Sequence, residues 1–189
     1  MAHEGHDHHG PHEHHHGPDA PALGPVAEHR ERAPAQVACW VITCTDTRDG
    51  ATDESGPRVR HALEAAGHTV LGASVARDEP NEIRHALTLA KDSGVRAVVL
   101  TGGTGLSARD VTVETVRPLF SKPIDGFGEL FRALSFQQIG PAAMASRAVA
   151  GVWEGIVVFA LPGSPAAVSL ALERLIVPEL GHLVREASR

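Results

Sequence analysis

The sequence contains no tyrosine, few other aromatic residues and no long apolar run. Aromatic residues make up 4 % of the 189 residues, so the core must be built mainly from Val, Leu, Ile and Ala. No apolar run reaches the ~18–20 residues that a membrane-spanning helix requires, and the N-terminus is polar. We therefore expect a cytoplasmic protein without a membrane segment. The 42 % hydrophobic and 21 % charged content is typical of a soluble globular domain.

The sequence also lacks an excess of basic charge and has only two cysteines. The formal net charge is −6, and the residues before Val37 carry six acidic side chains and two arginines. Nucleic acid is therefore not an expected partner, because domains that bind it present a basic face. Cys39 and Cys44 are five residues apart and would point to opposite faces of a strand. We expect them to be buried free thiols that do not share a metal ion.

Residues 1–36 differ in composition from the rest of the chain. Eight histidines stand between Met1 and Asp19, among Gly, Pro and acidic residues and without hydrophobic periodicity. Such a segment buries too little apolar surface to offset the entropy of ordering, so we predict a disordered tail. Its imidazoles could chelate Zn²⁺, Ni²⁺ or Co²⁺, and a merely solvated tail or a purification tag is the alternative. The histidine groups with chelating spacing are His3/His6/His8/His9 and His12/His14/His15/His16.

From Val37 onward, apolar runs typical of buried strands alternate with helical patterns. Three strand–helix repeats of this length predict right-handed βαβ units and a parallel sheet. Two later strands that meet at Glu154-Gly155 predict a hairpin-like pair. We therefore predict one domain over 37–189: a three-layer, Rossmann-like α/β/α sandwich with a mostly parallel central sheet and a small β-hairpin. The predicted strands are 37–44, 68–75, 95–101, 148–153 and 156–161, and the predicted helices are 53–66, 80–92, 113–120, 128–134, 164–175 and 178–187.

The loop at 101–105, with the sequence Thr-Gly-Gly-Thr-Gly, directly follows the third predicted strand. In open α/β sheets, ligands bind beyond the carboxyl ends of the strands. The three glycines let backbone N–H groups point into one concavity, and Thr101, Thr104 and Ser107 add hydroxyl groups. A helix that begins near Thr112 would add the positive end of its dipole. This pattern predicts an anion site that holds a phosphorylated ligand.

Two better-known phosphate motifs do not fit this loop. It is not a Walker A loop, because no Gly-Lys-Ser/Thr follows. Gly103-x-Gly105-x-x-Ala108 matches the relaxed dinucleotide fingerprint, with Asp125 about twenty residues further on. That fingerprint belongs to the first strand of its unit, whereas this loop follows the third, and Asp125 lies in the Pro/Gly-rich stretch Ser121–Gly128. NAD is therefore not the expected ligand.

Asp78 and Asp110 are the carboxylates that the sequence singles out. Each stands at the carboxyl end of a predicted strand, beside an arginine. Each could simply cap a following helix. Two carboxylates that flank a phosphate loop also suit Mg²⁺ that bridges phosphate oxygens. Ser164 does not lie in a nucleophile elbow, and we expect the scattered His61, His68, His85 and His182 on the surface.

Four motifs together resemble the MoaB/MogA family of molybdenum-cofactor biosynthesis proteins. The likeness runs in order over 37–189, and the histidine-rich tail has no counterpart in it. The motifs are Thr-Gly-Gly-Thr-Gly-x-Ser-x-Arg-Asp-Val-Thr at 101–112, Gly-Phe-Gly-Glu-Leu-Phe-Arg at 126–132, Ser-Arg at 146–147 and Leu-Pro-Gly-Ser-Pro at 161–165.

The resemblance implies a molybdopterin-binding domain that forms a homotrimer or hexamer. The best-described members of this family adenylylate molybdopterin: its terminal phosphate attacks the α-phosphate of Mg·ATP and expels pyrophosphate. The resemblance assigns the catalytic role to Asp78 and Asp110, which would also hold Mg²⁺ through the nucleotide phosphates. The expected substrate-binding residues are Thr45, Asp46, Thr101, Gly102, Gly103, Thr104, Gly105, Ser107, Arg109, Gly126, Glu129, Ser146, Pro162, Gly163 and Ser164.

Two other functions remain open at this point. A member of this family could bind the pterin as a non-catalytic assembly module, and the histidine-rich tail could make the chain a metal buffer. A molybdenum-insertion protein is a further expected partner.

Overall fold

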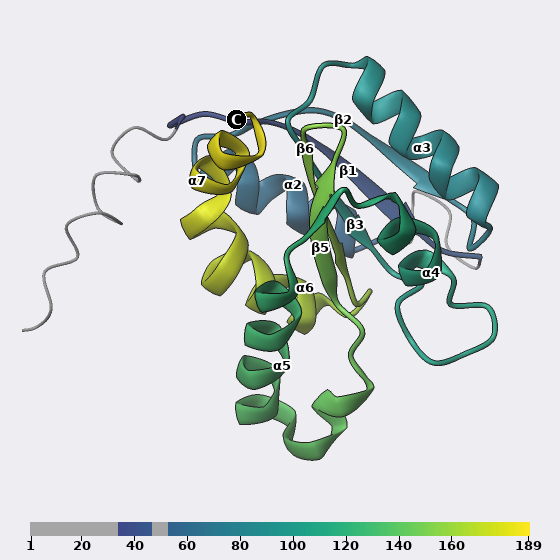
Figure 1. Ribbon diagram of the computed structural model, residues 1–189. Helices are drawn as coiled ribbons and strands as arrows, with labels where there is room; N and C mark the ends of the chain where they lie inside the picture. The colour runs from purple at the N-terminus through teal and green to yellow at the C-terminus, as the bar shows by residue number, and fades with distance from the viewer. Residues whose placement is uncertain (1–33, 47–52) are drawn as a thin grey trace, which may run out of the picture.

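The computed structural model describes residues 34–46 and 53–189 (Figure 1). The predicted histidine-rich tail lies outside these ranges, apart from residues 34–36. In the described part, strands and helices alternate from Ala38 onward and form three layers around a central sheet. The predicted α/β/α sandwich is therefore confirmed.

The central sheet has six strands in the order β2-β1-β3-β6-β5-β4. The four strands β2, β1, β3 and β6 run parallel, so their carboxyl ends lie at one edge of the sheet. β5 and β4 continue the sheet in antiparallel pairing, and β5 with β6 forms the predicted hairpin. The strands are β1 (Ala38–Cys44), β2 (Thr69–Ala76), β3 (Ala97–Thr101), β4 (Lys122–Pro123), β5 (Val149–Trp153) and β6 (Ile156–Leu161).

Helices cover both faces of the sheet (Figure 1). One face carries α2, α5, α6 and α7, and the other carries α3 and α4. The helices are α2 (Ser55–Ala65), α3 (Pro80–Asp92), α4 (Thr112–Val116), α5 (Asp125–Ile139), α6 (Pro165–Ala171) and α7 (Val177–Ala187), with 3₁₀ turns η1 (Arg117–Leu119) and η2 (Gly140–Ala145) and the π-helical turn η3 (Leu172–Ile176).

The core consists of two apolar clusters, one on each face of the sheet. Because side chains alternate along a strand, Cys39 and Val41 of β1 belong to one cluster, and Ile42 and Cys44 belong to the other. The two cysteines therefore lie on opposite faces as free buried thiols, as predicted. Burial raises the pKa of both thiols to about 12, so they stay protonated at neutral pH.

Some predicted helix bounds are wrong for identifiable reasons. α5 begins at Asp125 and continues to Ile139, so Asp125 lies in a helix and the predicted helix 128–134 was too short. Its glycines interrupt the usual helical pattern. Position 128 needs a glycine, because a Cβ atom there would lie only 2.7 Å from the carbonyl oxygen of Ala148 in the loop before β5. The predicted helix 113–120 changes to a 3₁₀ turn at Arg117, beside Pro118, which has no N–H donor.

One histidine is misplaced by the sequence prediction. His68 is buried, and its Nδ1 accepts a hydrogen bond from the Val37 backbone N–H at 3.3 Å. Burial lowers the pKa of this imidazole, which keeps it neutral and able to accept that bond. His61 and His85 are exposed as predicted, whereas His182 is half-buried and lies 3.0 Å from Glu179.

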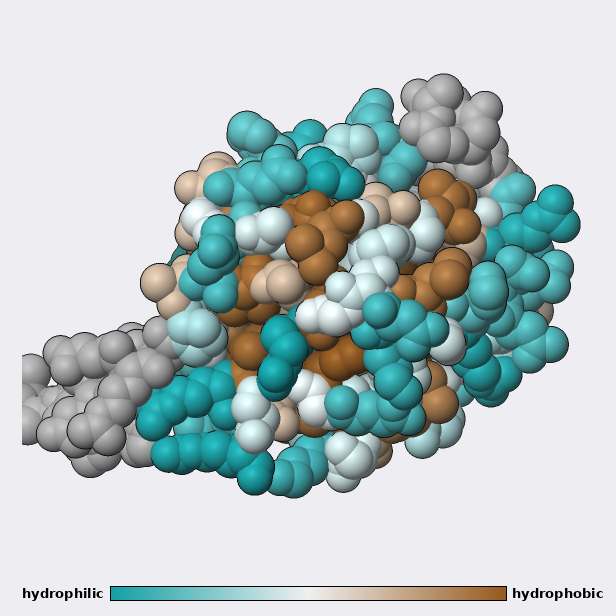
Figure 2. Space-filling model, turned by 90° about the horizontal axis from the view of Figure 1, so that it is seen from above, coloured by the Kyte–Doolittle hydropathy of each residue, from teal (hydrophilic) through white to brown (hydrophobic). Residues whose placement is uncertain are grey.

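The surface is mixed in polarity. On the face that Figure 2 shows, hydrophobic residues gather near the centre and hydrophilic residues surround them. Within residues 34–46 and 53–189, no helix is both long and apolar enough to cross a membrane.

The position of the core predicts the effect of removing the tail. Among the residues that the structure describes, both apolar clusters draw their members from Val37 and later positions. We expect deletion of residues 2–33 to change the melting temperature by less than about 2 °C, measured by circular dichroism. A fall of more than about 5 °C in melting temperature would contradict the assignment of the tail as an appendage.

Candidate functional site

A cavity of about 620 Å³ opens at the carboxyl ends of the parallel strands. β1, β3 and β6 are direct neighbours in the sheet, so the loops that follow them meet at this point. Asp78, which follows β2, closes one side, and Phe131 and Ile139 of α5 form an apolar wall. The predicted site residues that line the cavity are Thr45, Asp78, Thr101, Gly102, Gly103, Thr104, Gly105, Asp110, Ser146, Pro162, Gly163 and Ser164.

The glycine-rich loop is held by backbone contacts that only glycine permits. Gly102 has φ +93°, and a Cβ atom there would lie 2.1 Å from the carbonyl oxygen of Cys44. Its N–H donates to the Leu161 carbonyl at 3.0 Å, so this amide is not available to a ligand. Gly103, with φ +61°, accepts a hydrogen bond from the Thr112 N–H at 3.0 Å. The loop is thereby fixed to β1, β6 and α4 before any ligand binds.

The loop after β6 packs directly against the glycine-rich loop. A Cβ atom on Gly163 would lie 3.2 Å from the Cα of Gly102, so the two backbones are in close contact. Ser55, at the start of α2, donates its hydroxyl to the Gly163 carbonyl at 2.9 Å. Ser164 caps α6 by accepting the Ala167 N–H at 3.3 Å. Ser164 therefore has a structural role as well as a place in the cavity wall.

Asp53 supports the site from outside, and the sequence analysis missed it. Its Oδ2 accepts a hydrogen bond from the Thr43 hydroxyl at 2.6 Å, at the end of β1. Its Oδ1 accepts the N–H groups of Ser55 and Gly56 at 2.9 and 3.1 Å, so it also caps α2. The signal was present, because the sequence Asp53-Glu54-Ser55-Gly56-Pro57 contains capping residues and a proline, which are typical of a helix start.

Asp78 lies beside two other carboxylates. Its backbone N–H donates to Asp46 at 3.1 Å, and its own Oδ1 is buried without a hydrogen-bond partner in the described residues. Burial raises the pKa of Asp78, and the negative charges of Asp46 and Asp110 raise it further, while Arg109 partly offsets them. A cation close to Asp78 would therefore stabilise its ionised carboxylate.

Asp110 has a local structural contact as well. Its Oδ2 accepts the Ser107 N–H at 2.9 Å, and the bond closes the turn that follows the glycine-rich loop. Arg147 reinforces this turn from behind, since it donates to the carbonyl oxygens of Thr104 and Asp110 at 3.1 Å each. Arg147 also pairs with Glu114, and this contact lowers the pKa of Glu114. The loop that carries Asp110 is therefore clamped to α4.

The carboxylates fit Mg²⁺ only together with a phosphate ligand. Among the described residues, no three His, Cys, Asp or Glu side chains lie close enough to hold a metal by themselves. Mg²⁺ commonly binds through one or two carboxylates and the phosphates of a substrate. The unpartnered Oδ1 of Asp78, with Asp110 nearby, is consistent with that mode.

Several predicted residues do not line the cavity. Asp46 is exposed beside Asp78, and Ser107 and Arg109 belong to the turn outside the cavity wall. Gly126 and Glu129 lie near the start of α5, where Glu129 lines a separate hollow of about 270 Å³. The structure therefore does not bring these last two residues to the main cavity.

The sequence analysis also missed the cavity's apolar side. Phe131 and Ile139 lie on α5, and Ala145 ends the following turn. On a helix, such residues have the same pattern as ordinary core residues, so no sequence signal separates the two roles. Thr43 and Ser135 add polar groups that were likewise not predicted.

The fold and the cavity place the chain in a class: α/β/α proteins that hold ligands at the carboxyl ends of parallel strands. A family model described as "Probable molybdopterin binding domain" matches residues 39–182. Molybdenum cofactor biosynthesis protein B of Halalkalibacterium halodurans is 48 % identical over 163 residues, which cover 85 % of this chain and 96 % of that protein. The protein of the same name from Bacillus subtilis is 49 % identical with the same coverage.

Solved structures agree with these relatives. The crystal structure of the tungsten cofactor synthesizing protein MoaB from Pyrococcus furiosus superposes with a TM-score of 0.77. It is 39 % identical, and the match covers 83 % of this chain and all of that one. The chain belongs to the MoaB/MogA family of molybdopterin-binding domains.

The contact of Gly102 with Cys44 can be tested against a matched glycine. Gly102→Ala is expected to lower the free energy of unfolding by about 3 kcal/mol or more, because a positive φ and a steric clash add. Gly67 has a similar φ of +87°, but a Cβ atom added there would have nothing within 4 Å. Gly67→Ala is therefore expected to cost only about 1–2 kcal/mol. Equal losses in urea unfolding would show that no close contact exists at Gly102.

The raised pKa of Asp78 predicts that this carboxylate destabilises the fold at neutral pH. Because the pKa of Asp78 is higher in the folded state, its ionisation lowers the free energy of unfolding. This loss of stability becomes smaller as the pH falls through the folded pKa. We expect Asp78→Asn to raise the melting temperature by about 1–3 °C at pH 7.5, and by less at pH 4. Glu173→Gln, at an exposed position on η3 within a continuous helical run, is the control and should give no rise. A lower melting temperature for Asp78→Asn at pH 7.5 would contradict this account.

Proposed function

We propose that the cavity binds molybdopterin and transfers AMP from Mg·ATP to its terminal phosphate. The observation that carries the proposal is the position of Asp78 and Asp110 at the rim of a rigid glycine-rich loop. Membership of a molybdopterin-binding family supports the pterin as the ligand. The cavity volume of about 620 Å³ is in the range of small-molecule sites.

The proposed reaction requires positioning more than an activated nucleophile. A phosphate oxygen of the pterin forms a bond to the α-phosphorus of ATP, and the bond from that phosphorus to the β-phosphate bridging oxygen breaks, so pyrophosphate leaves with the electron pair. The attacking phosphate is already ionised at neutral pH and needs no general base. The chain's contribution is to hold the two phosphates in line and to offset their mutual repulsion.

The described residues divide this task between two loops. The glycine-rich loop offers the hydroxyls of Thr101 and Thr104, and Thr101 Oγ1 is buried with no hydrogen-bond partner among the described residues. Ser146 also lines the cavity, and its buried hydroxyl likewise has no hydrogen-bond partner in the described part of the chain. Mg²⁺, when bound by Asp78 and Asp110, would neutralise charge on the nucleotide phosphates.

One observation favours a second candidate, a non-catalytic molybdopterin-binding module. Asp110 already accepts the Ser107 N–H and so has a structural reason to be present. If Asp110 serves only to form that bond, the glycine-rich loop keeps the shape that binds the pterin, and the chain catalyses no AMP transfer. The two candidates differ in turnover and agree in pterin binding.

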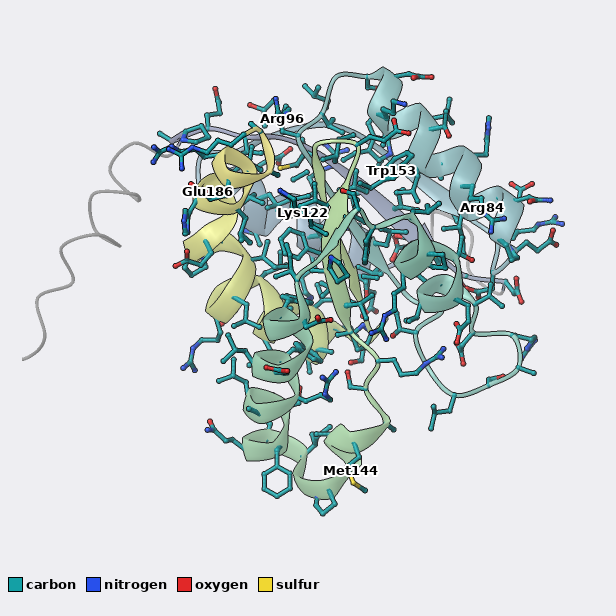
Figure 3. The ribbon with its side chains drawn as sticks, viewed as in Figure 1. Arg84, Arg96, Lys122, Met144, Trp153 and Glu186 are labelled. Atoms are coloured by element: carbon teal, nitrogen blue, oxygen red, sulfur yellow. The ribbon has the colours of Figure 1, made fainter. Side chains whose placement is uncertain are left out.

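We also propose a homotrimer or hexamer that works in the cytoplasm and passes its product to a molybdenum-insertion protein. Support for self-association comes from large apolar side chains that are exposed on α5 and on the turn after it. Figure 3 shows Met144 of η2 at the far end of the segment that α5 and η2 form. Met144 is 82 % exposed. The other exposed apolar residues of this segment are Leu130, Phe136 and Ile139. Light scattering of the purified chain measures its oligomeric state.

The test of the proposed function is pyrophosphate release. Purified protein with molybdopterin and Mg·ATP should release pyrophosphate, and Asp110→Asn should lower the rate at least about 100-fold with pterin affinity changed less than about threefold. Asp92→Asn serves as the control with the same change of charge. Pterin binding without pyrophosphate release by the unaltered protein would leave the binding module as the function, and an unchanged rate for Asp110→Asn would remove the role of that residue.

The activity should also depend on pH through Asp78. Its pKa is raised by burial and by Asp46 and Asp110, so protonation should lower the rate at a pH above the usual range of an aspartate. Asp46→Asn removes one of the negative charges, so the acidic limb of the pH–rate profile should move to lower pH. An acidic limb that does not move in Asp46→Asn would mean that another group controls it.

A further inference from the structure

A second, basic hollow lies behind the Ser146-Arg147 segment. It has a volume of about 710 Å³ and lies between α4 and η1 on one side and α5 on the other. Ser146 lines both this hollow and the main cavity, so the segment forms a thin partition between the two. Arg117, Arg132 and Arg147 all line the hollow, and only Arg147 has an ion-pair partner among the described residues, which is Glu114.

The position of Arg132 is built into α5. Arg132 is half-buried, and its guanidinium lies over Gly128, where a Cβ atom would come within 3.0 Å of Nη1 and 3.3 Å of Nη2. Glycine at this helix position, although unfavourable for helix stability by about 1 kcal/mol, makes room for the guanidinium. Gly128 and Arg132 do not line the main cavity. Their contact instead places the Arg132 guanidinium in the wall of this hollow.

Two arginines of the hollow have no ion-pair partner among the described residues. Glu114 pairs with Arg147, whereas Arg117 and Arg132 form no ion pair in the part of the chain that the structure describes. Arg117 and Arg132 also line the smaller adjoining hollow together with Asp125 and Glu129, but neither carboxylate lies within ion-pair distance of them. The guanidinium of Arg132 is half-buried, and its planar donor fork matches an oxyanion with two accessible oxygens.

We propose that this hollow binds an oxyanion of the phosphate class through Arg117 and Arg132. Arg147 connects the hollow to the main cavity, because it lines the hollow and also holds the carbonyl oxygens of Thr104 and Asp110. A bound anion would therefore lie beside the residue that holds the loop of Asp110 in place. The ligand is free phosphate, or the phosphate end of a larger molecule such as pyrophosphate. This proposal is independent of the AMP transfer proposed above, since it concerns a different set of residues.

The experiment uses the full chain and two probes, inorganic phosphate and pyrophosphate. Each probe is titrated by calorimetry in the presence of saturating Mg·ATP, which occupies the main cavity if the proposed function is right. Arg132→Gln is expected to weaken binding of at least one probe about tenfold or more, whereas Arg132→Lys, which keeps the charge, should lose less. Arg84→Gln is the control, because Figure 3 shows Arg84 on α3, away from α5, and its substitution should change nothing.

Each outcome bears on the proposal. Tighter binding of phosphate than of pyrophosphate identifies the free ion as the ligand, and the reverse order identifies a phosphate chain. Equal binding of both probes by the unaltered protein and by Arg132→Gln overturns the proposal, because the anion then binds outside this hollow. A change in oligomeric mass for Arg132→Gln, measured by light scattering, also overturns it, because the hollow is then a subunit contact.

A folding control keeps the result interpretable. Circular dichroism and melting temperature show whether Arg132→Gln keeps its fold, and Arg117→Gln, at an exposed position on η1, provides a second variant with less risk to packing. Arg117→Gln should also weaken binding of the same probe. If the unaltered protein binds neither ATP nor pterin but binds phosphate in a manner that depends on Arg132, the proposed function fails and this inference stands.

Discussion

The approach of Gly102 to two other strands is the constraint on which the site depends. This residue touches the Cys44 carbonyl of β1, donates to Leu161 at the end of β6 and lies against Gly163. The ends of β1, β3 and β6, which are distant in the sequence, are thereby packed together around one residue. A side chain at this position would push β1 away from β3, and the cavity could not keep its shape. The shape of the cavity wall is therefore fixed by main-chain packing.

The site also brings negatively charged side chains close together, and their repulsion opposes the packing. Asp78 is partly buried next to Asp46 and Asp110, and their mutual repulsion opposes folding at neutral pH. The hydrogen bonds of Asp53 and Ser55 add stability nearby, because they connect α2 to the end of β1 and to the loop after β6. Binding sites commonly carry such a local loss of stability, and a ligand that binds the folded state offsets it.

The sequence was informative where one physical rule decides the structure. The helix predicted over Pro80–Asp92 matches α3 residue for residue, because its apolar period is clear and Pro80 marks its start. The cavity could be located in advance because parallel strands place their carboxyl ends together. Its apolar wall could not be predicted, since Phe131 has the pattern of a core residue until the position of α5 is known. Glu129 was predicted to bind the substrate because it lies in a motif of the family, but its position on α5 places it in the wall of another hollow.

The direction of the parallel strands also separates the two ends of the domain. β1 begins at Ala38 and delivers the chain to the cavity after seven residues, a rise of roughly 20 Å. Pro34, Gln36 and the final residue Arg189 line one shallow hollow at the opposite end of the sheet from the cavity. Both ends of the described domain therefore lie away from the cavity. A compact fusion partner or a surface tether attached closely at either end would leave the mouth of the cavity open, which makes this domain suitable for immobilisation.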